Sequence, residues 1–225
     1  YEAEQSITLL HQQTLHRRLI IGVDRLDYSK GLPERLKSFR ALLDRYPEHR
    51  KAVTLMQVAA PTREDLGAYA DIRQELEGLS GAINGEYGDF DWTPVRYIHR
   101  SVPREILAAI FRGCQVGLVT PLRDGMNLVA KEYIAAQRPE DPGMLVLSRF
   151  AGAAEELHEA LIVNPYDFDD VANAMQTAIT MSLEERRERH QALYRRIKAG
   201  DVRHWRETFL AALRSARTET VATGR

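Results

Sequence analysis

The chain has 225 residues, of which 44% are hydrophobic and 28% charged, and its formal net charge is −1. This is the composition of a globular protein with enough apolar residues for one large or two small domains, and the balanced charge gives no indication of nucleic acid or an anionic membrane as a partner. No apolar stretch approaches the roughly 18 residues that a membrane-spanning helix needs. Cys114 is the only cysteine. It excludes an intrachain disulfide and favours a reducing compartment, the cytoplasm.

Residues 1–17 begin with tyrosine and show a loose helical pattern, so we expect a helix that leads in from a missing N-terminal domain, with no signal peptide. From there, short apolar runs alternate with helical patterns. In chain order we predict a strand at Arg18–Asp24, a helix at Leu32–Tyr46, a strand at Ala52–Ala60, a helix at Thr62–Leu79, a loop over residues 80–93, a strand at Pro94–His99 and a helix at Pro103–Cys114.

The second half continues the alternation. We predict a strand at Val116–Val119, a helix at Met126–Gln137, a strand at Gly143–Phe150, a helical turn over residues 151–157, a strand at Ala160–Asp167 and three helices over residues 169–181, 182–200 and 201–216. The predicted strands are continuous apolar runs, which is typical of a parallel sheet that is covered on both faces.

The predicted fold class is therefore α/β, a doubly wound, Rossmann-like parallel sheet with a helical C-terminal tail. We divide the chain into a lead-in helix (1–17), a Rossmann-like domain (18–180) and C-terminal helices that pack back on the fold (181–225).

Charged residues follow three of the predicted strands, at the edge of a parallel sheet where ligands bind. Arg25 and Lys30 come after the first strand, Arg63 after the second and Arg123 after the fourth. Cations on converging loops suit a polyanionic ligand such as a phosphate. Each of these segments, taken alone, is equally compatible with a surface ion pair or a turn, but their joint placement at strand exits favours a binding site.

The segment after the fourth strand also carries Asp124 and Gly125. Gly125 lies at the expected start of the Met126–Gln137 helix, where it lets a ligand approach the backbone, and the amides of Met126, Asn127 and Leu128 would face an anion. Asp124 and Glu132 are eight residues apart, which on one helix places them on one broad side, about 80° apart in projection. Glu132 could therefore reach a sugar hydroxyl that is attached to the bound phosphate.

Several familiar motifs are absent or misplaced. Neither GxxxxGK[ST] nor GxGxxG occurs, so the chain carries no P-loop and no dinucleotide fingerprint. The DxDx[TV] signature of aspartyl-phosphate phosphatases does occur, as Asp89 to Thr93. That chemistry needs its first aspartate at the tip of an apolar strand, whereas a predicted loop precedes Asp89, so we reject this interpretation.

Four segments resemble the trehalose-6-phosphate synthase family of retaining glycosyltransferases: VDRLDYSKGLPERL, YGDFDWTPVRYI, GLVTPLRDGMNLVAKEY and ALIVNPYD. The resemblance runs from about Leu19 to Leu210. It implies the C-terminal, nucleotide-sugar-binding half of a GT-B enzyme that moves glucose from UDP-glucose to glucose-6-phosphate with retention of configuration.

The resemblance also implies roles for individual residues. It assigns Arg25 and Lys30 to the donor diphosphate, Asp124 to the transferred glucose and Glu132 to the ribose. The backbone near Ser101 and Val102 would bind uracil, and the backbone from Gly125 through Met126, Asn127, Leu128 and Val129 would bind the donor phosphate and sugar. Arg63 would contact the acceptor phosphate. Arg25, Lys30 and Asp124 are the residues to which catalysis is assigned, with no metal and no cofactor.

The family's N-terminal half, which carries most acceptor-binding residues, is missing from this chain. We therefore expect a donor-binding half that is inactive alone and has the N-terminal half as its partner, with a homo-oligomer possible. Two alternatives stay open: a non-catalytic nucleotide-sugar-binding module, and a related glycosyltransferase with another acceptor. The sequence does not decide among UDP, GDP and ADP. We expect structural roles for Cys114, for His99 and for Trp205 as a packing anchor of the last helix.

Overall fold

A computed structural model describes residues 17–62 and 67–222. Its centre is a sheet of six parallel strands in the order β3-β2-β1-β4-β5-β6. The strands are β1 (Arg18–Arg25), β2 (Val53–Ala60), β3 (Val95–Ile98), β4 (Val116–Val119), β5 (Met144–Ser148) and β6 (Leu161–Val163). The doubly wound parallel sheet predicted from the alternating pattern is confirmed.

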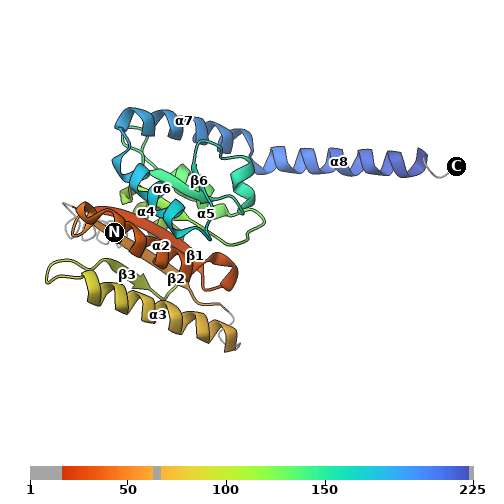
Figure 1. Cartoon of the computed structure of the whole chain (residues 1–225). Coiled ribbons are helices and arrows are strands. Elements are labelled where there is room, and N and C mark those ends of the chain that lie inside the picture. Colours follow the sequence, from red (N-terminus) through yellow and green to blue (C-terminus); the bar gives the residue numbers. More distant parts are fainter. Residues whose placement is uncertain (1–16, 63–66, 223–225) are drawn as a thin grey trace.

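Helices cover both faces of the sheet (Figure 1). They are α2 (Leu32–Arg45), α3 (Gly67–Tyr87), α4 (Arg104–Gly113), α5 (Leu128–Ala136), α6 (Phe168–Thr180), α7 (Leu183–Ala199) and α8 (Val202–Ala222), with single-turn helices η1 (Tyr28–Lys30), η2 (Pro47–His49) and η3 (Gly152–Glu155). One apolar cluster joins the sheet to α2, α3 and α6, and the other joins it to α4, α5 and α7.

The strands explain why their sequences are continuously apolar. In β1, Ile20 points into the first cluster, whereas its neighbours Leu19 and Ile21 point into the second, and all three are almost completely buried. Successive side chains of a strand point to opposite faces, so a sheet that is covered on both faces needs apolar residues at every position.

Three helices differ from the sequence prediction by two or more residues at one end, among them α8, which ends at Ala222 and not at residue 216. The loop predicted from residue 80 is wrong at its start, because α3 continues to Tyr87. Gly81 and Gly85, which fall in the predicted loop, lie on the exposed side of α3 with open space where a Cβ atom would be, as does Gly78 one turn earlier. Helix α5 begins at Leu128, two residues later than predicted. Residues 1–16, with the predicted lead-in helix, lie outside the described part.

Helix α8 extends away from the sheet and its covering helices (Figure 1). Four of its apolar side chains, Val202, Trp205, Phe209 and Leu213, are between 49% and 81% exposed. Trp205 stacks on Phe209 with ring centroids 5.3 Å apart. The prediction that Trp205 anchors the last helix by packing is therefore not met. Among the described residues, no helix is long and apolar enough to cross a membrane.

Candidate functional site

The candidate site lies at the carboxyl ends of β1 and β4, which are neighbours in the sheet. From β1 the chain continues through α2 to β2, and from β4 it continues through α5 to β5, on the other side. Such a reversal of strand order opens a crevice where parallel α/β sheets bind ligands. We call residues 26–31, after β1, the β1 loop, and residues 120–127, after β4, the β4 loop.

The β1 loop is a single helical turn closed by its own side chains. The Asp27 carboxylate accepts hydrogen bonds from the Ser29 amide at 2.9 Å and from the Ser29 hydroxyl at 2.8 Å. Partial burial alone would raise the pKa of Asp27, but these bonds and the nearby Lys30 lower it below its ordinary value. Gly31 ends the turn at φ +64°, a conformation that glycine adopts without steric cost. The loop thus holds Lys30 in a fixed place.

Lys30 and Asp124 meet between the two loops. The Lys30 amine lies 2.7 Å from the Asp124 carboxylate, and both side chains are largely shielded from solvent, at 14% and 16% exposed. The Asn127 amide nitrogen donates to the same carboxylate oxygen at 3.0 Å. A cation and a carboxylate predicted to serve one ligand are therefore in direct contact.

Asn127 also caps α5. Its side-chain oxygen accepts a hydrogen bond from the Ala130 amide at 3.0 Å, while its backbone has φ +77°. Because the helix begins only at Leu128, the prediction that Asp124 and Glu132 share one helix is wrong. Asp124 lies in the loop before α5, and Asn127 links it to the helix. The first-turn amides of Leu128 and Val129 have no acceptor within the helix, so with this helix start they, rather than those of Met126 and Asn127, are the helix amides that could face an anion.

Neighbouring backbone holds the β4 loop on both sides. The Ser29 carbonyl accepts hydrogen bonds from the amides of Leu122 at 2.9 Å and Arg123 at 3.2 Å. On the other side, the Asp124 amide donates a hydrogen bond to the Phe150 carbonyl at 3.1 Å, and the Asp124 carbonyl accepts one from the Gly152 amide at 3.0 Å. The loop that carries Asp124 is therefore built into the fold like an additional short strand.

Gly152 allows this close approach. A Cβ atom at this position would lie 2.2 Å from the Gly125 carbonyl oxygen. Gly125, in contrast, has no atom within 4 Å of where its Cβ would be, and it is exposed. Close packing of the loop against the protein therefore depends on Gly152, whereas the open space at Gly125 is compatible with the predicted approach of a ligand to the backbone.

The remaining predicted residues surround this centre. Arg25 ends β1 with an exposed side chain, and Gly125, Met126 and Leu128 are also exposed, whereas Val129 is half-buried. Ser101 and Val102 follow β3 and precede α4, at the same end of the sheet. Glu132, on α5, forms an ion pair with Arg104, which is the third residue after Ser101; the two charged groups are 3.3 Å apart. Arg63 lies outside the described residues.

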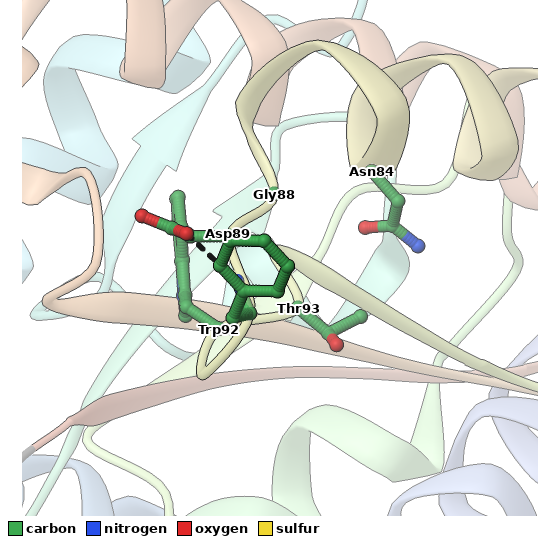
Figure 2. A pocket seen from close by; sticks show the side chains of 6 residues that line it. Asn84, Gly88, Asp89, Trp92 and Thr93 are labelled. Carbon is green, nitrogen blue, oxygen red and sulfur yellow. Dashed lines mark hydrogen bonds between the residues drawn. The ribbon is translucent and has the colours of Figure 1, made fainter.

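Residues of the phosphatase-like motif, Asp89 to Thr93, line a separate pocket (Figure 2). Asp89 exchanges backbone hydrogen bonds with Trp92 and pairs with Lys51. This turn follows α3 and precedes β3, so it lies at the amino end of that strand, away from the candidate site. Asp89 is therefore not at the tip of a strand, which is the position that phosphatase chemistry would need.

A cavity of about 810 Å³ adjoins the candidate site. Its lining includes Met126 and Leu128 from the site, Lys131 and Glu156, which pair at 2.6 Å, and Trp205 from α8. Within the part of the chain that the structure describes, no three His, Cys, Asp or Glu side chains gather in a way that could hold a metal ion. The absence of a metal from the site stays a prediction.

The sequence analysis missed Arg35. This residue lies on the apolar face of α2, between Leu32 and Phe39 in the helical pattern, and its side chain is fully buried. A lone charge in the buried stripe of a helix is rare unless it is paired, and this was the signal available in the sequence. Its partners include Asp24 and Thr120, the residues at the exits of β1 and β4.

The model of glycosyltransferase family 20 matches residues 2–215. The chain belongs to this family. The trehalose-6-phosphate synthase of Sodalis glossinidius (strain morsitans) is 54% identical over 200 residues, which are 89% of this chain and 43% of that protein. The enzyme of the same name from Escherichia coli (strain K12) is 55% identical over 195 residues, 87% of this chain and 41% of its length.

Solved structures agree in fold. An alpha,alpha-trehalose-phosphate synthase (UDP-forming) from Burkholderia xenovorans, in complex with glucose-6-phosphate, superposes with a TM-score of 0.90 at 53% identity, over 92% of this chain and 46% of that one. An E. coli structure bound with UDP-2-fluoro glucose gives a TM-score of 0.90 at 52% identity, with 93% and 46% covered. The Rossmann-like fold of one half of a GT-B glycosyltransferase is confirmed, and this family 20 chain spans less than half the length of these relatives.

Proposed function

We propose that this chain is the donor-binding part of a trehalose-6-phosphate synthase, a retaining UDP-glucose-dependent glycosyltransferase. The observation that carries the proposal is the Lys30–Asp124 contact at 2.7 Å, beside the first turn of α5 and at the point where the strand order reverses. A cation, a carboxylate and free helix amides at one place are what a nucleoside diphosphate sugar requires. A relative that is 52% identical binds a UDP-glucose analogue.

The donor would lie across the carboxyl ends of the strands. Arg25 and Lys30 bind the diphosphate together with the amides of Leu128 and Val129, and Asp124 binds the glucose. Glu132 on α5 binds the ribose, and the backbone of Ser101 and Val102 binds uracil. The ion pair of Glu132 with Arg104, close in sequence to Ser101, supports this order, because the proposed ribose contact then lies on the same side of the site as the proposed uracil contact.

The reaction would break the bond between the anomeric carbon of glucose and the β-phosphate oxygen of UDP. The hydroxyl on the anomeric carbon of glucose-6-phosphate attacks from the same face, and its proton passes to the leaving phosphate oxygen, which gives trehalose-6-phosphate and UDP with retention. No protein nucleophile is then needed. Arg25 and Lys30 stabilise the negative charge that develops on UDP, and they act as fixed electrostatics in the transition state.

The acceptor would be bound mainly by an N-terminal half, with Arg63 contacting its phosphate. Relatives about twice as long as this chain support such a partner. The exposed apolar face of α8 supports it too, because apolar patches of this kind mark interaction surfaces. Alone, the chain binds nucleotide but has no activity, and a homo-oligomer of the whole enzyme is compatible with this arrangement. The single, buried cysteine is compatible with the cytoplasm.

A titration of UDP into the chain, followed by calorimetry, tests the donor site. Lys30→Ala removes a charge-assisted contact with phosphate, so the affinity should fall by about tenfold or more. Lys37→Ala is the matched control: Lys37 lies on α2 and pairs with Glu75 at the surface, and its loss should leave the affinity unchanged. Equal affinities of the Lys30→Ala variant and the parent chain would remove Lys30 from the phosphate site.

Mixing the chain with an N-terminal half tests the reaction itself. Formation of trehalose-6-phosphate from UDP-glucose and glucose-6-phosphate would exclude the alternative of a non-catalytic nucleotide-sugar-binding module. Release of UDP with a different sugar acceptor, and none with glucose-6-phosphate, would favour a related glycosyltransferase instead.

A further inference from the structure

Arg35 lies beneath the candidate site, inside the fold. Its side chain is fully buried between α2 and the sheet. Gly22 of β1 makes room for it, because a Cβ atom on Gly22 would lie 2.5 Å from the Arg35 Nη1 atom. With no exposed surface, Arg35 cannot touch a ligand, so any role in the site is exerted through other residues.

The guanidinium of Arg35 contacts the carboxyl-terminal part of β1, the middle of β2 and the residue that follows β4. Nη1 donates to the Asp24 carboxylate at 2.7 Å and to the Gln57 side chain at 3.0 Å, and Nε donates to the Thr120 hydroxyl at 3.1 Å. Asp24 directly precedes Arg25, and Thr120 is the first residue of the β4 loop. One buried cation is therefore bonded to the starts of both segments that carry the proposed donor contacts.

Above Arg35 the two loops are already in contact. The Ser29 carbonyl accepts hydrogen bonds from two β4-loop amides, and Lys30 pairs with Asp124. Gly31 fits so closely against the β4 loop that a Cβ atom there would lie 2.7 Å from the Thr120 carbonyl oxygen. The relative position of Lys30 and Asp124 thus depends on how firmly the bases of the loops are held.

Stability alone is a weak reason for this arrangement. Replacing a buried ion pair by apolar residues of similar size is often neutral or stabilising. Moreover, the Arg35 Nη2 atom is buried with no hydrogen-bond partner among the described residues, which is itself a cost. A buried cation with an unsatisfied donor, placed between two functional loops, is better explained by the geometry that it imposes.

We propose that Arg35 is a positioning residue that couples the β1 loop to the β4 loop and thereby sets the spacing of Lys30 and Asp124 for the donor. The ligand part of this inference rests on the proposed function. The coupling of the two loops does not, and it can be measured without any ligand.

The test uses Thr120→Val, which removes the hydroxyl that accepts from Arg35 and keeps the shape of the side chain. The coupling predicts that amide hydrogen exchange becomes faster by about 3- to 10-fold in both loops, over residues 26–31 and 121–127, since one bond to a charged group is lost. It also predicts that the affinity for UDP falls by a similar factor.

Thr54→Val is the matched control. Thr54 is equally buried, and its hydroxyl accepts a hydrogen bond from the Trp92 indole at the opposite end of the sheet. This variant should leave exchange in both loops and UDP affinity within about twofold of the parent chain. If Thr120→Val and Thr54→Val gave the same loop exchange and the same affinity, Arg35 would be a structural residue only.

The Asp24→Asn/Arg35→Met double variant separates positioning from burial of charge. Arg35→Met alone leaves a buried carboxylate without its cation, whereas the double variant removes both charges and should still fold. We expect a melting temperature close to that of the parent with a loss of UDP affinity of about tenfold. A folded double variant with parental affinity would overturn the inference.

Failure of the parent chain to bind UDP would count against the donor site. The hydrogen-exchange experiment would still decide whether Arg35 couples the two loops.

Discussion

Asp124 holds the cation that we assign to the diphosphate, since its carboxylate lies 2.7 Å from the Lys30 amine. Replacing it by asparagine removes a negative charge beside the bound phosphates. Asp124→Asn should therefore bind UDP at least as tightly as the parent chain, by up to about threefold, because Lys30 loses its competing partner.

The same variant should lose its preference for the sugar nucleotide, since Asp124 is assigned to glucose. The ratio of the dissociation constants of UDP and UDP-glucose, measured by calorimetry, should move toward one. A variant that bound UDP much more weakly, with the ratio unchanged, would show that Asp124 acts on the phosphates rather than on the sugar.

Cys114 is a buried thiol that takes no part in the site. Burial raises its pKa well above the ordinary value of 9.0, because the thiolate would be in an apolar environment. Native protein should therefore react with iodoacetamide slower than urea-unfolded protein by about 100-fold or more. Equal rates in the two states would show that Cys114 is accessible.

The raised pKa of Cys114 also makes stability depend on pH. The unfolded thiol ionises near its ordinary pKa, whereas the folded thiol stays neutral, so stability is complete below this value and falls as the pH rises above it. The free energy of unfolding in urea should decrease by up to about 1.4 kcal/mol per pH unit above this pKa. Cys114→Ala should make this alkaline decrease shallower, whatever its effect at neutral pH.

At the scale of the elements, α3 is a helix that its glycines made difficult to predict. Gly78, Gly81 and Gly85 are exposed within a regular helix and have open space where a Cβ would go. Gly81→Ala should stabilise the protein by about 0.5–1 kcal/mol, because alanine loses less conformational freedom in a helix.

Gly117→Ala is the contrasting variant. Its Cβ would lie 2.7 Å from the Tyr133 ring inside the core, so it should destabilise the protein. Urea unfolding measures both changes. A loss of stability in Gly81→Ala would contradict the placement of that glycine on the open side of α3.

Most helices and strands could be predicted from the sequence, because both faces of the sheet are buried. Residues such as Leu19, Ile20 and Ile21 of β1 are buried whatever their direction, so the strand was visible as a continuous apolar run. The start of α5 was not predictable, because it depends on Asn127, which adopts φ +77° and uses its side chain to cap the helix. Helical periodicity does not report on a single residue of this kind.

The site was predicted in its parts but not in its construction. Position after a strand was enough to select Lys30 and Asp124, since parallel strands bring their ends together. Their contact, the fit of Gly152 against Gly125 and the buried Arg35 depend on residues that are distant in sequence. No local pattern contains such contacts, and only the folded chain brings them into view.

At the scale of the whole molecule, α8 is the element without a partner. Trp205 on this helix is 56% exposed, whereas Trp92, the other tryptophan, is 2% exposed. If an N-terminal half covers α8, its addition should shift tryptophan emission to shorter wavelength, because Trp205 leaves water.

Trp205→Phe is the control for this experiment, since it removes the reporter and preserves an aromatic ring. The shift should be absent in that variant, and Trp92 should contribute a constant, buried signal. An unchanged spectrum of the parent chain on adding the N-terminal half, in a mixture that forms trehalose-6-phosphate, would show that α8 is not part of the contact.

The ion pair between Lys30 and Asp124 joins residues 94 positions apart in the chain. Contacts of such long range form late, because a large loop must close before they yield any energy. The nucleotide site should thus appear only when β1 and β4 are side by side and both flanking layers of helices are in place. During refolding, recovery of UDP binding should lag behind recovery of helical circular dichroism. The time course of UDP binding would then report when the last step of sheet assembly takes place.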